Sequence, residues 1–222
     1  MPEKNISLFL SGNEATLWVM DSGTAALFGT ALYFLALINP ASKIFLLSSE
    51  NPPLSAKKIR NISLQSTGVA FLILLSVTVI GKLVLNSVFH VEIYSLKVAG
   101  GIILFIMGLQ AVRNGRFYES SLHGSTTDIS VVPLGAPLIA GPGTITATIS
   151  YRTSFGVEHT MIALAIALAI NLLLMLSSVW IARILDRFHV IGPLIRITGL
   201  IVSAVAVQMV LGGIGEWYAA VR

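Results

Sequence analysis

The chain has 222 residues, of which 55% are hydrophobic and only 11% are charged, and its mean hydropathy is +0.86. Soluble domains carry about 25% charged residues, so this composition excludes a soluble globular, disordered or collagen-like protein. The net charge of +4 is too small and too scattered for a nucleic-acid binder, and the lack of cysteine excludes disulfides, thiolate metal sites and thiol catalysis.

Six apolar stretches are each close to the ~20 residues that cross ~30 Å of hydrocarbon. In chain order they are residues 25–47, 64–85, 93–112, 131–151, 161–184 and 191–214. The fourth stretch contains three prolines. The sequence therefore predicts an all-α integral membrane protein with six transmembrane helices.

The first 23 residues do not form a signal peptide, because their apolar run, residues 6–10, is too short. Asn13 can cap a short interfacial helix anchored by Trp18; the alternative, which stays open, is that this segment extends the first span. Lys and Arg concentrate in the loops after the first, third and fifth spans, which predicts that both termini lie outside the cytoplasm. The loops on that richer side hold Lys57, Lys58, Arg60, Arg113, Arg116, Arg183 and Arg187, against Lys4, Lys82, Arg152 and Arg222 on the other.

The third and sixth spans are similar to each other when they are aligned with an offset of 98 residues and no gaps. Six of twenty positions are identical: Ile93 and Ile191, Leu96 and Leu194, Gly101 and Gly199, Ile103 and Ile201, Gln110 and Gln208, Val112 and Val210. The first and fourth spans also correspond, at Asn39-Pro40-Ala41-Ser42 and Gly141-Pro142-Gly143-Thr144. Three spans in each half invert the second half relative to the first, as in many secondary transporters. We therefore expect an N-terminal tail (1–23), a first three-span repeat (24–115), a linker (116–130) and a second three-span repeat (131–222).

Proline breaks a helix because it lacks a backbone donor and clashes with the preceding turn. A break inside the membrane is tolerated only within protein or beside a water-filled cavity, and it leaves free N–H groups on one side and free carbonyls on the other. The N–H end favours a carboxylate and the carbonyl end an ammonium group, so two facing breaks could hold a zwitterion. The alternative is that both are ordinary proline kinks. The predicted substrate-binding residues are Asn39, Pro40, Ser42, Gly141, Pro142, Gly143 and Thr144.

Other polar residues within the spans are few. Asn171, Gln110 and Gln208 are expected behind the site or in bonds between helices, which is the usual role of buried amides in membrane helices. Lys43 can either attract an anionic group or extend to the membrane interface, and the second interpretation is favoured. No acid or histidine lies centrally in a span, so we expect no intramembrane proton relay, metal site or cofactor and no enzymatic activity.

The fourth-span sequence Val132-Pro133-Leu134-Gly135-Ala136-Pro137-Leu138-Ile139-Ala140-Gly141-Pro142-Gly143-Thr144 resembles the corresponding signature of the MarC family. Residues 99–105 resemble its third span, residues 199–208 its sixth, and Asn39-Pro40 its first-span Asn-Pro. The likeness covers about residues 25–215. The chain departs from the family at Ala41-Ser42-Lys43, where members usually have Leu-Gly followed by a second proline.

The resemblance implies an inner-membrane secondary transporter or exporter of small neutral amino acids such as glycine, alanine or threonine. The expected partners are such an amino acid and the lipid bilayer, with homo-oligomerisation left open. The alternatives are a passive channel for small polar solutes and a non-catalytic assembly or lipid-handling protein. On the residues alone, without an intramembrane acid, facilitated exchange is favoured over ion-driven transport.

Overall fold

A computed structural model describes residues 22–48, 54–115, 139–187 and 190–222. These residues form seven helices: α2 (Ser22–Ile38), α3 (Pro40–Ser48), α4 (Ala56–Ser87), α5 (Ile93–Asn114), α7 (Pro142–Leu176), α8 (Ser178–Arg187) and α9 (Ile191–Val221). The predicted tail up to residue 21, the linker 116–130 and residues 131–138 of the fourth span lie outside the described residues.

Within the described residues, five helical stretches are long and apolar enough to cross a membrane, which confirms an all-α integral membrane protein. They are Gly23–Ser48 (α2 with α3), Ala56–Ser87, Ile93–Asn114, Pro142–Leu176 and Ile191–Val221. The fourth predicted span contributes only its second half to this set, as the first part of α7.

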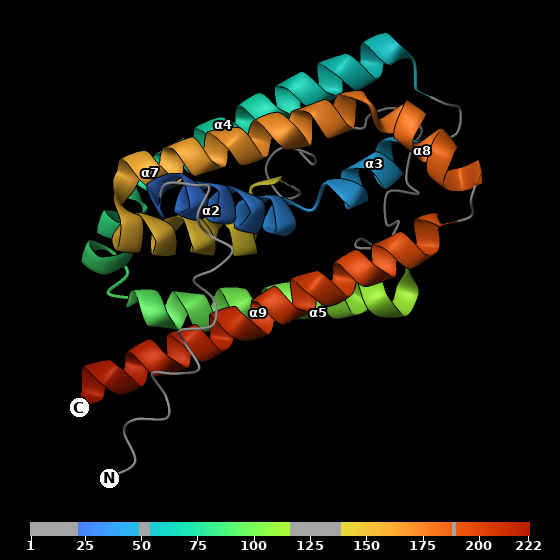
Figure 1. Ribbon diagram of the computed structural model, residues 1–222. Helices are drawn as coiled ribbons and strands as arrows, with labels where there is room; N and C mark the ends of the chain where they lie inside the picture. Colours follow the sequence, from blue (N-terminus) through green and yellow to red (C-terminus); the bar gives the residue numbers. More distant parts are fainter. Residues whose placement is uncertain (1–21, 49–53, 116–138, 188–189) are drawn as a thin grey trace.

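The fourth and fifth predicted spans have different limits in the structure. The end of the fourth span and the fifth span are joined in α7, where Gly156 has φ 85° and ψ 172° and reverses the chain (Figure 1). Only glycine adopts this conformation readily. The fifth span is then interrupted at Ser177, after which α8 begins, so the single helix predicted over 161–184 is wrong in this detail.

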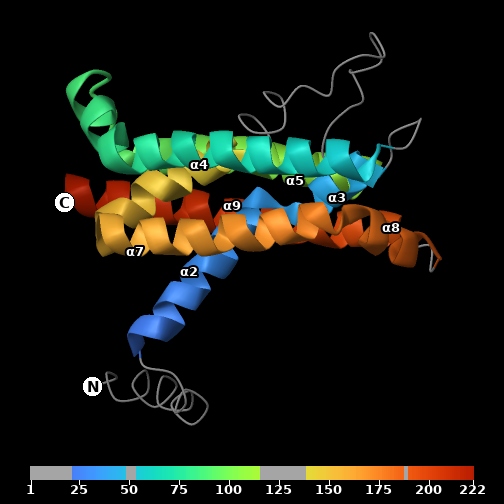
Figure 2. The ribbon, with the colours of Figure 1, turned by 90° about the horizontal axis from the view of Figure 1, so that it is seen from above.

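Helices α5 and α9 lie side by side and run antiparallel, whereas α4 packs on the long arm of α7 (Figure 1). Seen from above, α2 crosses the other helices at a steep angle and α3 turns to run along them (Figure 2). The change of direction falls at Asn39, between the two helices.

The contacts between α5 and α9 repeat the internal symmetry of the sequence. A Cβ atom on Gly101 would lie 2.9 Å from the Ala206 carbonyl oxygen and 3.2 Å from the Val210 nitrogen. A Cβ on Gly199 would lie 2.9 Å from the Gly108 carbonyl oxygen and 3.1 Å from the Val112 nitrogen. Shifting each residue of the first set by 98 positions, across the halves, gives the second set. The two helices are therefore related by the twofold axis that an inverted repeat requires; the exact limits of the two repeats stay a prediction.

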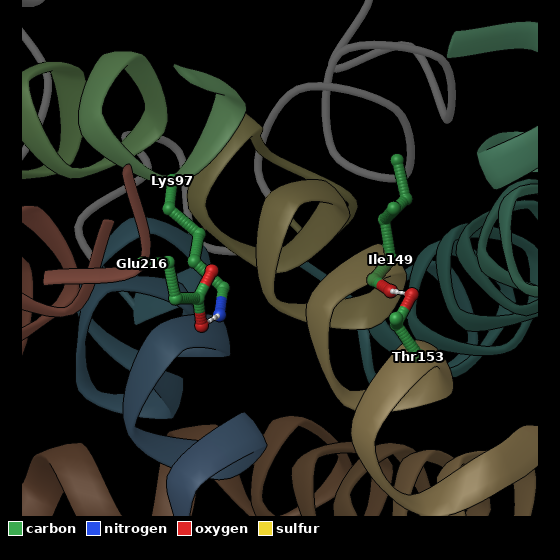
Figure 3. A network of polar contacts seen from close by, with 4 residues as sticks. All are labelled: Lys97, Ile149, Thr153 and Glu216. Atoms are coloured by element: carbon green, nitrogen blue, oxygen red, sulfur yellow. Dashed lines mark hydrogen bonds and ion pairs between the residues drawn. The ribbon is translucent and has the colours of Figure 1, made fainter. Parts of the chain in front are cut away.

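The first turn of α5 is also joined to the last turns of α9 by an ion pair between Lys97 and Glu216 (Figure 3). The Glu216 side chain is 47% exposed, and pairs of this kind contribute about 0–1 kcal/mol. Close packing at the glycines, rather than this pair, holds the two helices together.

Candidate functional site

The first break in the membrane-spanning helices is centred on Asn39. Its φ of 54° is left-handed, a conformation that asparagine tolerates better than most residues. Pro40 contributes to the break because a proline disfavours helical geometry in the residue before it. The Asn39 side chain is buried, and its amide Nδ2 has no hydrogen-bond partner among the described residues.

Two side chains of α3 bond back to the end of α2. The Ser42 hydroxyl donates to the Asn39 carbonyl oxygen at 2.8 Å. The Lys43 ammonium donates to the Ile38 carbonyl oxygen and, at 3.4 Å, to that of Asn39. Lys43 is 1% exposed, so the interpretation that it extends to the membrane interface is wrong. The ammonium instead bonds the carbonyl end of α2, where the Ile38 oxygen has lost its helical donor because the Ser42 N–H bonds the Asn39 oxygen.

The second break precedes α7. Gly141 is extended, with φ −74° and ψ 172°, and Pro142 begins the helix. The first hydrogen bond of α7 runs from the Ile145 N–H to the Gly141 carbonyl oxygen at 2.9 Å. The N–H groups of Gly143 and Thr144 therefore precede the helical ladder, and neither donates to a described residue. Both residues are buried, so two N–H donors without a partner among the described residues lie at the start of α7 inside the protein.

The two breaks belong to one buried core. Ile38, beside the first break, and Ile139 and Ala140, beside the second, are members of the same cluster of packed apolar residues. Gly143 packs closely on α5, since a Cβ there would lie 2.8 Å from Leu104 Cδ1. Ser42 bonds within its own break, and the Thr144 carbonyl oxygen accepts from the Thr148 hydroxyl at 2.7 Å. Bonds across the two breaks are not among the contacts of the described residues.

The three amides predicted behind the site have different positions. Asn171 is fully buried on α7; its Nδ2 contacts the Met175 sulfur at 3.3 Å, and its Oδ1 has no partner among the described residues. Gln110 and Gln208 are exposed on the outer faces of α5 and α9. Each follows a residue of the α5–α9 interface, Gly108 or Ala206, by two positions, which is about 200° around a helix. Their expected role behind the breaks is therefore not supported by their positions.

The sequence analysis did not single out Ser63 and Ser66, two buried hydroxyls on α4 that lack partners among the described residues. They lie on the face that also holds Ile59, Ala70 and Leu74. This spacing of three to four residues, which places them on one helix face, is the sequence signal that could have identified Ser63 and Ser66.

A separate aromatic cluster joins α2 to the turn of α7. The Tyr33 and Tyr151 rings are 5.1 Å apart between centroids, Tyr151 stacks on Phe155 at 5.5 Å, and Phe155 stacks on His159 at 5.1 Å. The His159 Nε2 lies 3.1 Å from the Thr30 hydroxyl oxygen. That hydroxyl already donates to the Ala26 carbonyl at 2.9 Å, so it can accept from the imidazole N–H. This cluster packs the part of α2 that precedes the break against α7.

A small apolar pocket lies between α3, α8 and the start of α9. Ala41, Phe45, Leu185 and Ile195 are among its lining residues. It has little polar lining and does not include the free donors of the second break. We therefore place the candidate site at the breaks and not in this pocket.

Residues 24–218 match the MarC family of integral membrane proteins. The chain belongs to the MarC family. This MarC-family chain is 32% identical over 186 residues to a UPF0056 membrane protein of Pyrococcus horikoshii, covering 84% of the chain and 92% of the relative. It is 30% identical to the UPF0056 membrane protein YvbG of Bacillus subtilis, covering 81% and 89%.

A third relative is the UPF0056 inner membrane protein YhgN of Escherichia coli, which is 28% identical over 84% of this chain and 95% of its own length. No solved structure matches the chain. The comparisons confirm the resemblance carried by the fourth-span sequence and identify this MarC-family chain as a multi-pass membrane protein.

Proposed function

We propose that this chain is a secondary transporter or exporter of small neutral amino acids of the glycine, alanine or threonine type, in the inner membrane. The observation that carries the proposal is the start of α7, where two buried N–H donors have no partner in the part of the chain that the structure describes. Free N–H groups at a helix N-terminus favour a carboxylate, both by hydrogen bonding and through the helix dipole. The substrate carboxylate would bind Gly143 and Thr144.

The rest of the substrate would be held by neutral polar groups. The unpaired Asn39 amide can donate to the carboxylate, and the unpaired Asn171 oxygen, between Leu168 and Met175 of the core, can accept from the substrate ammonium. The carbonyl end of the first break, which would otherwise suit that ammonium, is already bonded to Lys43. Close packing of Gly143 on Leu104 favours small side chains over large ones.

Thermal unfolding of the purified protein against the twenty amino acids tests the proposal. A ligand that binds only the folded state stabilises it by RT ln(1 + [L]/Kd), so millimolar glycine, alanine and threonine should raise Tm. Lysine and glutamate should not, because a charged side chain buried without a partner costs several kcal/mol. Equal shifts with lysine or glutamate would contradict a site for neutral zwitterions.

Transport itself is tested by counterflow in proteoliposomes. A carrier exchanges faster when unlabelled substrate is present on the inside, and a passive channel does not. Thr144→Val removes a hydroxyl at the start of α7 and should slow exchange. Thr198→Val is the matched control, because the Thr198 hydroxyl bonds its own helix at the Leu194 carbonyl and its loss should leave exchange unchanged.

A further inference from the structure

The Lys43 ammonium lies at the carbonyl end of a broken membrane helix. Its two hydrogen-bond partners, the Ile38 and Asn39 carbonyl oxygens, are both backbone atoms of the break. The side chain is 1% exposed. Within the described part of the chain the one ion pair joins Lys97 to Glu216, so no described carboxylate compensates the Lys43 charge.

Of the two oxygens around Lys43, that of Ile38 has lost its helical donor. The Ser42 N–H, four residues later, bonds the Asn39 oxygen at 3.3 Å rather than continuing the ladder from Ile38, and the Asn39 oxygen also accepts from the Ser42 hydroxyl at 2.8 Å. The Ile38 carbonyl also lies at the negative end of the α2 dipole. Such an arrangement of unwound carbonyls and a helix C-terminus coordinates a sodium ion in transporters with discontinuous helices.

We propose that Lys43 is a built-in cation: its ammonium occupies the carbonyl site that a free monovalent cation such as sodium would otherwise fill. The tether keeps the ammonium beside these carbonyl oxygens at any sodium concentration. Sodium consequently has no role at this break in the natural protein. This inference concerns the folded protein alone and does not depend on the proposed transport function.

Thermal unfolding of the purified full-length protein tests the inference without a transport assay. Tm is measured in sodium chloride and in choline chloride at equal ionic strength, for the natural protein and for three variants. Lys43→Ala removes the ammonium and leaves space for an ion. Lys43→Met also removes the charge but keeps most of the side-chain volume. Lys97→Ala removes a lysine from the ion pair on α5 and serves as the control for a general effect of lysine loss.

We expect the natural protein and Lys97→Ala to unfold at the same temperature in both salts. Lys43→Ala should unfold at a lower temperature in choline, and sodium should raise its Tm in a saturable way. The rise should be about 5–10 °C at a sodium concentration a hundredfold above its dissociation constant. Lys43→Met should be destabilised without recovery in sodium, because its methyl-thioether end fills the space.

The inference is overturned if sodium stabilises the natural protein as it does Lys43→Ala, or if Lys43→Ala does not respond to sodium. It is also overturned if Lys97→Ala responds equally. Should Lys43→Ala fail to fold in any salt, Lys43→Arg decides. Retaining the charge, it should fold in choline with a Tm well above that of Lys43→Met, and a Tm no higher than that of Lys43→Met rejects the role of the charge.

Discussion

Asn39 shows how one residue determines the direction of a membrane helix. Its left-handed φ of 54° costs an ordinary L-residue about 1–2 kcal/mol, and glycine pays no such cost. We expect Asn39→Ala to lower the free energy of unfolding by about that amount relative to Asn39→Gly. Reversible unfolding in mixed micelles measures the difference.

The same two variants distinguish the role of the Asn39 backbone conformation from the role of its side-chain amide. Both variants lack the side-chain Nδ2, so both should bind glycine and alanine more weakly if the amide contacts substrate. Normal binding by Asn39→Gly would remove Asn39 from the site while leaving its conformational role intact.

Gly143 is packed so closely that bulk at this position meets Leu104 first. We expect Gly143→Val to abolish exchange by covering the two N–H donors, and to destabilise the protein by about 1–3 kcal/mol through overpacking. Adding Leu104→Ala should recover part of that stability, with a coupling of about 1–3 kcal/mol in a double-mutant cycle. Exchange measured on the double variant distinguishes the causes: recovery of exchange would mean that packing alone was at fault.

The sequence predicted the positions of both breaks because proline and glycine act locally. It did not predict the partners of the side chains around them. Lys43 was assigned to the interface because a sequence does not reveal that the Ile38 carbonyl beside it loses its helical donor. Gln110 and Gln208 occupy matching positions in the two repeats, but the direction in which their side chains point depends on which face of α5 meets α9.

At the scale of whole helices, the α5–α9 pair gives a quantitative prediction. A Cβ on Gly101 or Gly199 would approach a backbone carbonyl oxygen to 2.9 Å, and backbone atoms cannot move aside cheaply. Gly101→Ala and Gly199→Ala should each destabilise the protein by about 1–3 kcal/mol, and by similar amounts because the contacts are symmetric. Gly212→Ala, which meets no atom within 4 Å, should be neutral or stabilising by up to about 1 kcal/mol. Unequal effects of the first two variants would contradict the twofold relation.

The ends of the helices were less predictable than their approximate positions in the sequence. Hydropathy identified the apolar part of α4 but not its first two turns, which begin at Ala56 with the Ser55 hydroxyl accepting from the Lys58 N–H at 3.3 Å. Gly156 fell between two predicted spans, where the sequence indicated a loop, whereas the structure has a single-residue reversal. Turns of this kind depend on one backbone conformation and leave little trace in hydropathy.

At the scale of the whole molecule, the distribution of Lys and Arg predicts that the C-terminus lies outside the cytoplasm. The chain has no cysteine, so single cysteines report topology without background. Ala220→Cys should react with an impermeant maleimide in intact cells, and Lys57→Cys should react only after permeabilisation. Both residues are exposed, which makes labelling efficient. The opposite pattern would reverse the orientation.

Lys43 has no counterpart in the second half of the chain, where the matching position after Pro142 is Ile145. A carrier made of two equivalent inverted halves alternates between two states that mirror each other and have nearly equal energy. Here one half carries a lysine at its break and the other does not, so the two states of such a carrier would differ in energy. A bias of 1.4 kcal/mol already gives tenfold different populations at rest. If the chain is the carrier proposed above, we expect a preferred resting side and rates of transport that differ between the two directions in their dependence on substrate concentration.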